Sequence, residues 1–457
     1  MTTVLIKNGR ITTSSDQFKG DLWIEDDKIV LVGSKIIEKA DVIIDATDKW
    51  VFPGGIDAHV HMDVPCSDGS LSAGYDTETI AAARGGTTTM LDYVLQEKGQ
   101  LLQKTITDWK SKAARSSAID YGFHVIVTEP NETTIRDIEK LAKDGITSFK
   151  LFMANDIALR DKDLLRFMEE LKRQGCNACI HAENKDMIDY LQEKTILNGN
   201  VEPYYHPKSR PAITEAEAIQ RALALAELTG CPTLIAHIST EQGRKLVGAA
   251  KAKGLEVYGE SCPHYLLLTN ENYQKDSYES AKFVLSPPLR SEENRQGLWQ
   301  GVLGTDIDII SSDHNGFSYS THKQLGRQDY RKIPNGAPGI EHRYMLMYHF
   351  CQERGIELSR FVELVATNPA KIFGLYPQKG TLAPGSDADI VIVDPKVEQV
   401  ISANNQCQKS DYTPYEGFNL MGKVESVLLR GQLIVEKGKF IGQAGMGKFL
   451  KRAAKKA

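Results

Sequence analysis

The spacing of hydrophobic positions changes twice along the chain. Over residues 3–51, short apolar runs such as Val4-Leu5-Ile6 are separated by turn residues such as Asn8-Gly9, which is typical of strands in a small sheet. Over residues 53–375, apolar strand-like runs alternate with amphipathic segments of helical length, and after that region the strand-like pattern returns. The pattern therefore predicts an α/β region between two β-rich ends.

The middle region contains eight apolar runs with the length of a strand. They are Ile56–His61, Thr87–Val94, Tyr121–Val127, Ser148–Ala154, Asn177–Ala182, Thr233–Ser239, Glu256–Cys262 and Ile307–Ser312. Helices are predicted between them, among others at Ile135–Lys143, Asp161–Gln174, Ala216–Leu228 and Glu241–Lys253. Eight successive βα units predict an α/β fold of the TIM-type (β/α)8 barrel class, whose active site lies at the carboxyl ends of the strands.

The two β-rich ends are each too short to bury a robust core alone. The C-terminal runs are Ala388–Val393, Val424–Leu429 and Leu433–Glu436. We expect them to complete the N-terminal sheet, so that residues 1–52 and 376–457 form one smaller β-sandwich domain beside a barrel of residues 53–375. The basic tail, Lys448–Ala457, is expected to be a solvated arm.

Composition narrows the class of protein. The 457 residues are 41% hydrophobic and 25% charged with a formal net charge of -5, which is ordinary for a globular protein and indicates neither nucleic acid nor an anionic membrane as a partner. No apolar run approaches the roughly 20 residues that span a bilayer, and no signal-peptide pattern opens the chain. Seven scattered cysteines form no disulfide framework, and we interpret Cys179 of the Cys176-x-x-Cys179 pair as strand packing. These features predict a cytoplasmic protein.

The segment Asp57–His61 contains the first candidate chemistry. In an extended strand, side chains two residues apart project from the same face, so His59 and His61 can bind one metal ion together. Further metal-capable residues close later strands: His181 the fifth, His237 the sixth and Asp313 the eighth. Because the carboxyl ends of barrel strands meet at one edge, we expect these side chains to converge there. Imidazole and carboxylate ligands suit Zn²⁺ and similar divalent ions.

Lys150 lies in the fourth strand among apolar neighbours, Phe149 and Leu151. A bare ammonium is costly in such a place. Two accounts remain: the amine stays neutral with a lowered pKa, or it has reacted with CO₂ to form a carbamate. The carbamate is anionic and presents two oxygens that can bridge two cations. We favour the carbamate because the ligands are too many for one ion.

Three further histidines carry weaker signals. His124 lies within the third strand, His264 follows a proline in a loop, and His314 directly follows Asp313. We interpret each as a hydrogen-bonded structural residue or a neighbour of the site.

With these residues assembled, the chain resembles the cyclic amidohydrolases of the hydantoinase and dihydropyrimidinase family over essentially its whole length. The segments that carry the resemblance are Asp57–Pro65, Gly85–Thr89, Ser148–Lys150, His181–Asn184, Cys262–Leu266, Ser286–Arg290, Ser312–His314 and Asn335–Gly339.

The resemblance implies a pair of zinc ions. His59, His61 and Asp313 would hold one ion, His181 and His237 the other, and Lys150, carboxylated by CO₂, would bridge them.

The resemblance also implies substrate contacts and an assembly. Ser286 and Asn335 would bind the cyclic amide through backbone groups. The family usually has a tyrosine hydroxyl at the position of Asn155 to stabilise the oxyanion. An asparagine amide can still donate a hydrogen bond there, although it is shorter. A homotetramer or homodimer is expected.

The predicted reaction is the hydrolytic opening of a small cyclic amide or ureide, such as hydantoin, a 5-substituted hydantoin or a dihydropyrimidine, to an N-carbamoyl amino acid. A metal-activated water would attack the ring carbonyl, and Asp313 would carry its proton to the departing nitrogen. A dihydroorotase is disfavoured, because Met62-Asp63 follows the histidine pair where an arginine is wanted. An allantoinase-like hydrolase stays open as an alternative. A non-catalytic scaffold is disfavoured because all six ligand positions are intact.

Overall fold

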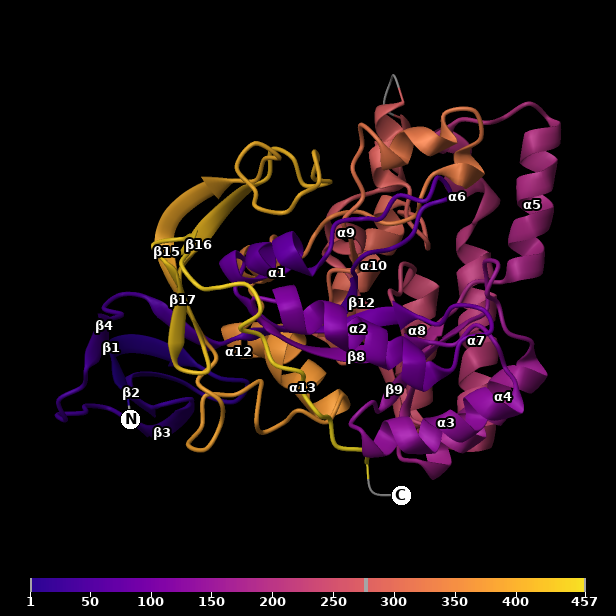
Figure 1. Cartoon of the computed structure of the whole chain (residues 1–457). Coiled ribbons are helices and arrows are strands. Elements are labelled where there is room, and N and C mark those ends of the chain that lie inside the picture. Colours follow the sequence, from indigo (N-terminus) through magenta and orange to yellow (C-terminus); the bar gives the residue numbers. More distant parts are fainter. Residues whose placement is uncertain (1, 275–277, 456–457) are drawn as a thin grey trace.

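A computed structural model describes residues 2–274 and 278–455 of the chain and shows a barrel beside a smaller sheet (Figure 1). The small sheet takes strands from both ends of the chain, as predicted. Its N-terminal strands are β1 (Thr3–Thr12), β2 (Gln17–Glu25), β3 (Lys28–Gly33), β4 (Val42–Asp45) and β5 (Trp50–Pro53). Its C-terminal strands are β15 (Ile390–Val400), β16 (Asn419–Leu429), β17 (Gln432–Glu436) and β18 (Lys439–Phe440).

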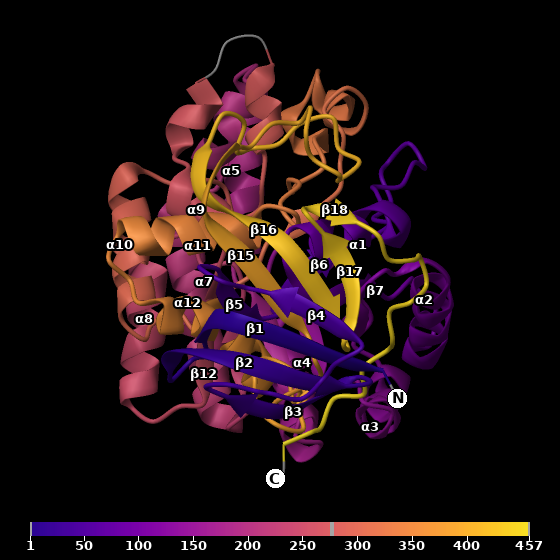
Figure 2. The same ribbon diagram turned by 90° about the vertical axis from the view of Figure 1, so that its left-hand side faces the viewer.

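The two halves of this sheet join at one strand pair. The strand order is β18-β17-β16-β15-β5-β1-β2-β3, with β4 on β1, and β5 runs antiparallel to β15 with Val51 opposite Ile392. Figure 2 shows the N-terminal strands, in indigo, beside the C-terminal strands, in yellow. Ile6, Val51, Ile392 and Leu428 are almost fully buried in one shared core. The second domain is therefore built from both chain ends because neither half covers its apolar face alone.

The barrel sheet contains the predicted strands in the predicted order. Its strands are β6 (Gly55–His61), β7 (Thr87–Leu95), β8 (Asp120–Ile126), β9 (Ser148–Phe152), β10 (Asn177–His181), β11 (Thr233–Ile235), β12 (Val257–Ser261), β13 (Ile309–Ile310) and β14 (His314–Asn315). All neighbouring pairs that follow the chain from β6 to β13 are parallel. This arrangement confirms the (β/α)8 class.

The eighth predicted strand, Ile307–Ser312, is shorter in the structure than expected, and a second short strand follows beyond its predicted end. The first part, β13, pairs with β12, and β14 pairs with β6, with His314 opposite Val60. Only residues 311–313 separate the two parts, so this one segment links both edges of the sheet and closes the barrel. The division places Asp313 where backbone pairing is interrupted, which leaves its side chain free to face the interior.

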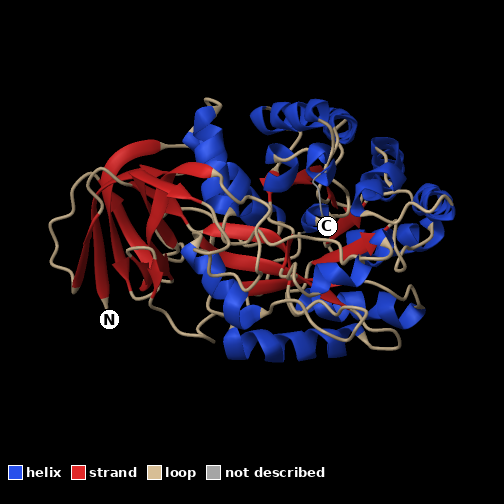
Figure 3. Cartoon of the chain, turned by 90° about the horizontal axis from the view of Figure 1, so that it is seen from above, coloured by secondary structure: helices blue, strands red, loops and turns tan. Residues whose placement is uncertain are grey.

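Helices surround the barrel sheet (Figure 3). They are α1 (Tyr75–Arg84), α2 (Leu102–Ser116), α3 (Glu132–Lys143), α4 (Asp161–Arg173), α5 (Lys185–Leu197), α6 (His206–Ser209), α7 (Ala212–Thr229), α8 (Glu241–Ala252), α9 (Pro263–Leu267), α10 (Glu292–Leu303), α11 (Arg343–Glu353), α12 (Leu358–Val362) and α13 (Asn368–Ile372). Short turns are η1 (Pro203–Tyr205), η2 (Asn270–Gln274), η3 (Glu279–Phe283), η4 (His322–Gly326), η5 (Tyr330–Lys332) and the π-helical η6 (Glu363–Thr367).

Local chemistry explains where helices start. Asn131 and Thr240 cap α3 and α8 by accepting hydrogen bonds from backbone N–H groups three residues on, which satisfies donors that the first turn leaves unpaired. The four helices that the periodicity predicted by residue range are all present within a few residues of the expected bounds. None of the helices in the described part of the chain combines the length and hydropathy that a bilayer crossing needs.

The basic tail contradicts its prediction as a solvated arm. Residues 448–455 pack along the barrel, and Arg452, only 3% exposed, donates from Nη1 to Ser148 Oγ (2.6 Å). Gly175 and Gly374 allow this close approach, because a Cβ there would lie 2.0 Å and 2.3 Å from tail carbonyl oxygens. The charge run misled the prediction because it hid Leu450 and Arg452, which are 6% and 3% exposed, between exposed residues such as Lys448 and Lys451. Residues 456–457 lie outside the described residues.

One buried ion cluster lies at the end of the barrel opposite the carboxyl ends of its strands. Lys379 is 1% exposed, and its Nζ lies 2.7 Å from Asp120 Oδ2, 2.7 Å from Asp389 Oδ2 and 3.0 Å from Asp387 Oδ2. Asp120 is the first residue of β8, whereas the two other carboxylates precede β15. The cluster thus ties the barrel to the small domain.

Candidate active site

All nine residues predicted from the sequence line one cavity of about 180 Å³ at the carboxyl end of the barrel. They are His59, His61, Lys150, Asn155, His181, His237, Ser286, Asp313 and Asn335. The predicted convergence of strand ends is therefore present in the structure.

The two histidines of β6 reach this cavity through a local irregularity. Ile56 and Ala58 belong to the core inside the barrel, whereas Val60 packs in the outer core against the helices. The pairing of β6 with β7 shifts register between Asp57 and Val60, and such a bulge redirects the side chains that follow. His59 and His61 consequently face the cavity together.

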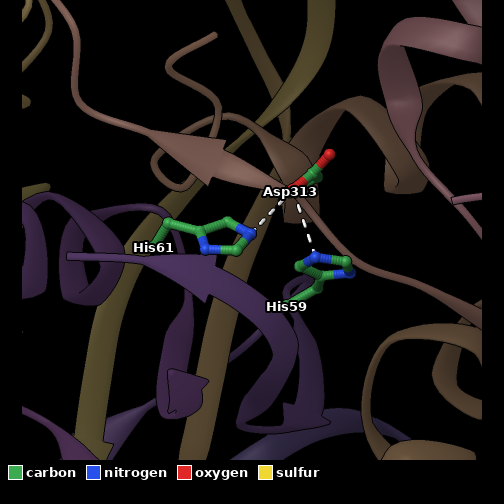
Figure 4. A group of neighbouring side chains, drawn as sticks. All are labelled: His59, His61 and Asp313. Atoms are coloured by element: carbon green, nitrogen blue, oxygen red, sulfur yellow. Dashed lines mark ion pairs between the residues drawn. The ribbon is translucent and has the colours of Figure 1, made fainter. Parts of the chain in front are cut away.

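Asp313 completes the first group of metal-capable side chains. Its Oδ1 lies 3.2 Å from His59 Nε2 and 3.4 Å from His61 Nε2, and Figure 4 shows the two rings directed toward the carboxylate. The three ligand atoms lie within 4.8 Å of one another, which is close enough to share one ion.

A second pair of imidazoles lies beside the first group. His181 Nδ1 is 3.0 Å from His237 Nε2, and the ring centroids of His59 and His237 are 5.4 Å apart. His181 Nε2 lies 3.0 Å from Glu183 Oε2. The two pairs therefore form one continuous group of possible ligands.

The histidines are kept neutral and oriented. Burial holds the pKa of the His59, His181 and His237 imidazoles below the usual range, so each retains a lone pair at neutral pH. His59 Nδ1 lies 2.8 Å from Glu260 Oε2. Burial raises the pKa of Glu260 to about 8, and the contact with this carboxyl group holds the ring with Nε2 on the side of Asp313.

Lys150 is fully buried and projects from β9 into the same cavity. Its Nζ has no hydrogen-bond partner among the described residues and lies 4.6 Å from the centroid of the Tyr93 ring. Burial lowers the pKa of this amine. A lysine with that environment is poorly suited to remain a free ammonium.

The backbone is strained where three of these residues lie. His237, Asp313 and Asn155 have φ values of 39°, 47° and 64°, in the left-handed region that side chains other than glycine rarely adopt. Such conformations tend to gather at functional sites, where the surrounding structure holds them.

The possible ligand atoms of this cavity suit divalent metal ions. His59 Nε2, His237 Nδ1 and Lys150 Nζ are all buried without a hydrogen-bond partner in residues 2–274 and 278–455. Buried polar atoms without partners are costly. Neutral imidazoles and a carboxylate are ligands that Zn²⁺ accepts, so a bound ion would satisfy His59 Nε2, and a carbamate on Lys150 would give its buried nitrogen a bonding role.

The predicted substrate contacts form a network around Arg210, which is 4% exposed. Its Nη1 donates to Glu183 Oε2 (2.7 Å) and Ser286 Oγ (3.1 Å), and its Nη2 donates to Asn155 Oδ1 (3.0 Å). Ser286 Oγ also donates to Glu183 Oε2 (2.8 Å). The Arg210 guanidinium therefore links Glu183, which contacts the metal-capable His181, to Ser286 and Asn155, the predicted substrate contacts.

A buried lysine holds the loops of the site. Lys323, in η4, is fully buried, and its Nζ donates to the carbonyl oxygens of Val284 (3.0 Å), Pro334 (2.6 Å) and Gly336 (2.7 Å). These carbonyls flank Ser286 and Asn335. The Lys323 amine thus contacts three carbonyl oxygens, which fixes the two segments relative to each other.

The remaining histidines agree with their interpretation. His124 is hydrogen-bonded to Ser148 and to the Ala58 carbonyl, and His314 Nε2 lies 3.0 Å from Glu78 Oε2. His264 lies close to Asp313, as a neighbour of the site.

Sequence reasoning missed Glu260, Arg210 and Lys323. Glu260 offered a signal, since it is an acidic residue inside the apolar strand before Cys262. Arg210 directly follows α6 and Lys323 lies in the short turn η4, in segments whose path no periodicity predicts, so only the structure brings them to the site.

The fold and this site define a barrel hydrolase of the metal-dependent kind. The chain matches the amidohydrolase family over residues 50–434. It is 43% identical to a D-hydantoinase of Ralstonia pickettii over 98% of both chains, and 42% identical to a D-hydantoinase of Geobacillus stearothermophilus over 99% of this chain and 97% of the relative. A dihydropyrimidinase structure from Brevibacillus agri superposes with a TM-score of 0.97 at 40% identity and covers 100% of both chains.

The chain belongs to the amidohydrolase family, in its hydantoinase and dihydropyrimidinase branch. The resemblance drawn from the motifs is thereby confirmed.

Proposed function

We propose that this protein opens cyclic amides and ureides by hydrolysis, with hydantoin, 5-substituted hydantoins or dihydropyrimidines as substrates and N-carbamoyl amino acids as products. The convergence of five metal-capable side chains and one buried lysine on a single cavity carries the proposal. The full-length similarity to D-hydantoinases supports it.

The site would hold two divalent ions, with zinc as the best match to its donors. His59, His61 and Asp313 would bind one ion, His181 and His237 the other, and Lys150 would bridge them as a carbamate. The orphaned nitrogens and the apolar surroundings of Lys150 support this assignment. Ions bound there would supply a water nucleophile at neutral pH and polarise the ring carbonyl.

The protein's own residues would place the ring and move the proton. Asp313 faces the cavity between the two histidines of β6, where its carboxylate can take a proton from the attacking water and return it to the ring nitrogen. Backbone groups at Ser286 and Asn335 would hold the cyclic amide. Asn155, fixed by Arg210, would donate a hydrogen bond at the same end of the cavity.

Turnover of a small substrate panel tests the proposal. The purified holoprotein should convert hydantoin to N-carbamoylglycine and dihydrouracil to N-carbamoyl-β-alanine, as measured by chromatography, and a chelator should stop both reactions. The absence of any product from a preparation that carries two divalent ions per chain would overturn the proposed function. The relatives and structures described above give no support to an allantoinase-like hydrolase or to a non-catalytic scaffold.

We also propose the domain limits, the oligomeric state and the cellular location of the protein. The domain limits are 1–52 with 376–457 for the sheet domain and 53–375 for the barrel. The protein acts as a homotetramer or homodimer, which sedimentation would test. It works in the cytoplasm, which the seven free cysteines support, since reduced thiols persist there.

A further inference from the structure

A second cavity lies beside the metal-capable one. Its volume is about 430 Å³, and Asn155 and Asn335 line both spaces. The wall between the cavities is therefore formed partly by two short amide side chains. The larger cavity is bounded by α5, by Arg210 and by η5, and it reaches exposed residues such as Asp156.

Two residues that line this second cavity carry buried polar atoms without partners in the described ranges. Arg210 Nε and Asn335 Oδ1 are buried and have no hydrogen-bond partner in the part of the chain that the structure describes. One is a donor and the other an acceptor. Asn155 accepts from Arg210 through Oδ1, so its amide nitrogen is left as a second donor. A ligand with both a carbonyl and an N–H group would satisfy these atoms.

The charges around the cavity balance. Three carboxylates and three cations line it: Asp156, Asp189, Asp329, Arg210, Arg331 and Lys332.

Several of these charges are already paired. Arg331 binds both oxygens of Asp329, and Lys185 Nζ lies 2.5 Å from Asp189 Oδ2. Burial lowers the pKa of His206 to about 3, so this ring is neutral as well. An ionic ligand group would lose its hydration here without a net opposite charge. A hydrocarbon group would leave the buried polar atoms unpaired. A neutral carboxamide avoids both costs, because it carries no charge to dehydrate and it can pair with the buried polar atoms.

We propose that this cavity is a subsite for a neutral carboxamide group carried by the ring substrate, and that it makes the enzyme prefer carboxamide-substituted hydantoins. The inference rests on the proposed function, because the ring must bind in the adjoining cavity. Gln192 of α5 lines the subsite but not the metal-capable cavity, so its side chain is placed to contact the substituent alone.

Three hydantoins of nearly equal size test the subsite, with racemic 5-(2-carbamoylethyl), 5-(3-methylbutyl) and 5-(2-carboxyethyl) side chains. The carbamoylethyl compound should have a kcat/KM about tenfold or more above both others, the effect of one to two hydrogen bonds. Gln192→Leu should reduce that ratio to less than about threefold. Gln103→Leu, the same change on α2, should keep it. Ratios formed within one variant are independent of any general loss of activity.

Two results would overturn the subsite while hydantoin itself is still turned over. In the first, the methylbutyl or the carboxyethyl compound equals the carbamoylethyl compound. In the second, Gln192→Leu keeps the full preference. If neither dihydrouracil nor any of the hydantoins is turned over, the proposed function fails and the subsite fails with it.

Discussion

Replacing Lys323 with Met should weaken substrate binding without a matching loss of stability. Methionine has a similar length but no donors, so the carbonyls of Val284, Pro334 and Gly336 lose their shared partner. Three buried acceptors left unpaired cost about 1 kcal/mol or more each. Burial also lowers the pKa of Lys323 from 10.5 to about 7, which means that keeping the ammonium charged in the folded protein costs about 5 kcal/mol. Methionine removes this cost. These two effects oppose each other, and the net change in stability should be within about 2 kcal/mol.

The functional effect should be larger, because the two segments that carry Ser286 and Asn335 lose their common anchor. We expect KM for hydantoin to rise about tenfold, equivalent to about 1.4 kcal/mol. Because the metal-capable residues are untouched, kcat should stay within about threefold. Steady-state kinetics, chemical unfolding and metal analysis on the same preparation measure the three quantities.

Lys379→Met is the matched control. It also removes a buried ammonium with three partners, but these are carboxylates at the opposite end of the barrel, and they hold the pKa of Lys379 above its usual range. The loss of stability should be about 3–5 kcal/mol, with KM unchanged. An unchanged KM in Lys323→Met would refute the positioning role of Lys323. So would a KM that rises in both variants in proportion to their loss of stability.

Substitutions at four other positions test the proton carrier, the metal bridge, the oxyanion contact and the tail. Asp313→Asn should abolish turnover while the circular dichroism spectrum stays native, and near-normal kcat would disprove the proton-carrying role. Lys150→Ala should lose bound metal and activity together, and a short carboxylic acid in the buffer should partly restore both; retention of both ions without the acid would rule out the bridge. Asn155→Tyr should raise kcat on hydantoin or dihydrouracil by up to about 10²-fold, unless the pocket is shaped for a different ring that the bulkier side chain blocks. Kinetics identical to wild type for both this variant and Asn155→Ala would place the residue away from the reacting carbonyl. Arg452→Met should lower the free energy of unfolding by about 1–3 kcal/mol, because Ser148 and the Phe123 carbonyl lose a buried donor; an unchanged unfolding curve would show that the tail contributes nothing to stability.

The barrel could be predicted from the sequence because its signals are periodic. Strand-length apolar runs at regular spacing predict βα units whatever their loops do, and the metal-capable residues lie at strand ends, where the fold brings them together. His181 and Asp313 were therefore placed correctly by position alone.

Loops and the tail could not be predicted in the same way. Arg210 and Lys323 reach the site along irregular backbone, and their partners are carbonyls and side chains distant in sequence. The division of the last strand around Asp313 also left no mark in the hydrophobic pattern. The tail was misjudged because charge density indicates solvent exposure, whereas Arg452 buries its guanidinium against the barrel.

The central claim is that one cavity holds two divalent ions joined by a carboxylated Lys150. The most direct measurement is a titration of metal-free protein with zinc, in buffer with and without bicarbonate, while hydantoin hydrolysis and bound metal are followed together. The account predicts that activity rises to a plateau at about two ions per chain and that recovery requires bicarbonate. Full activity at one ion per chain, or equal recovery in the two buffers, would contradict it.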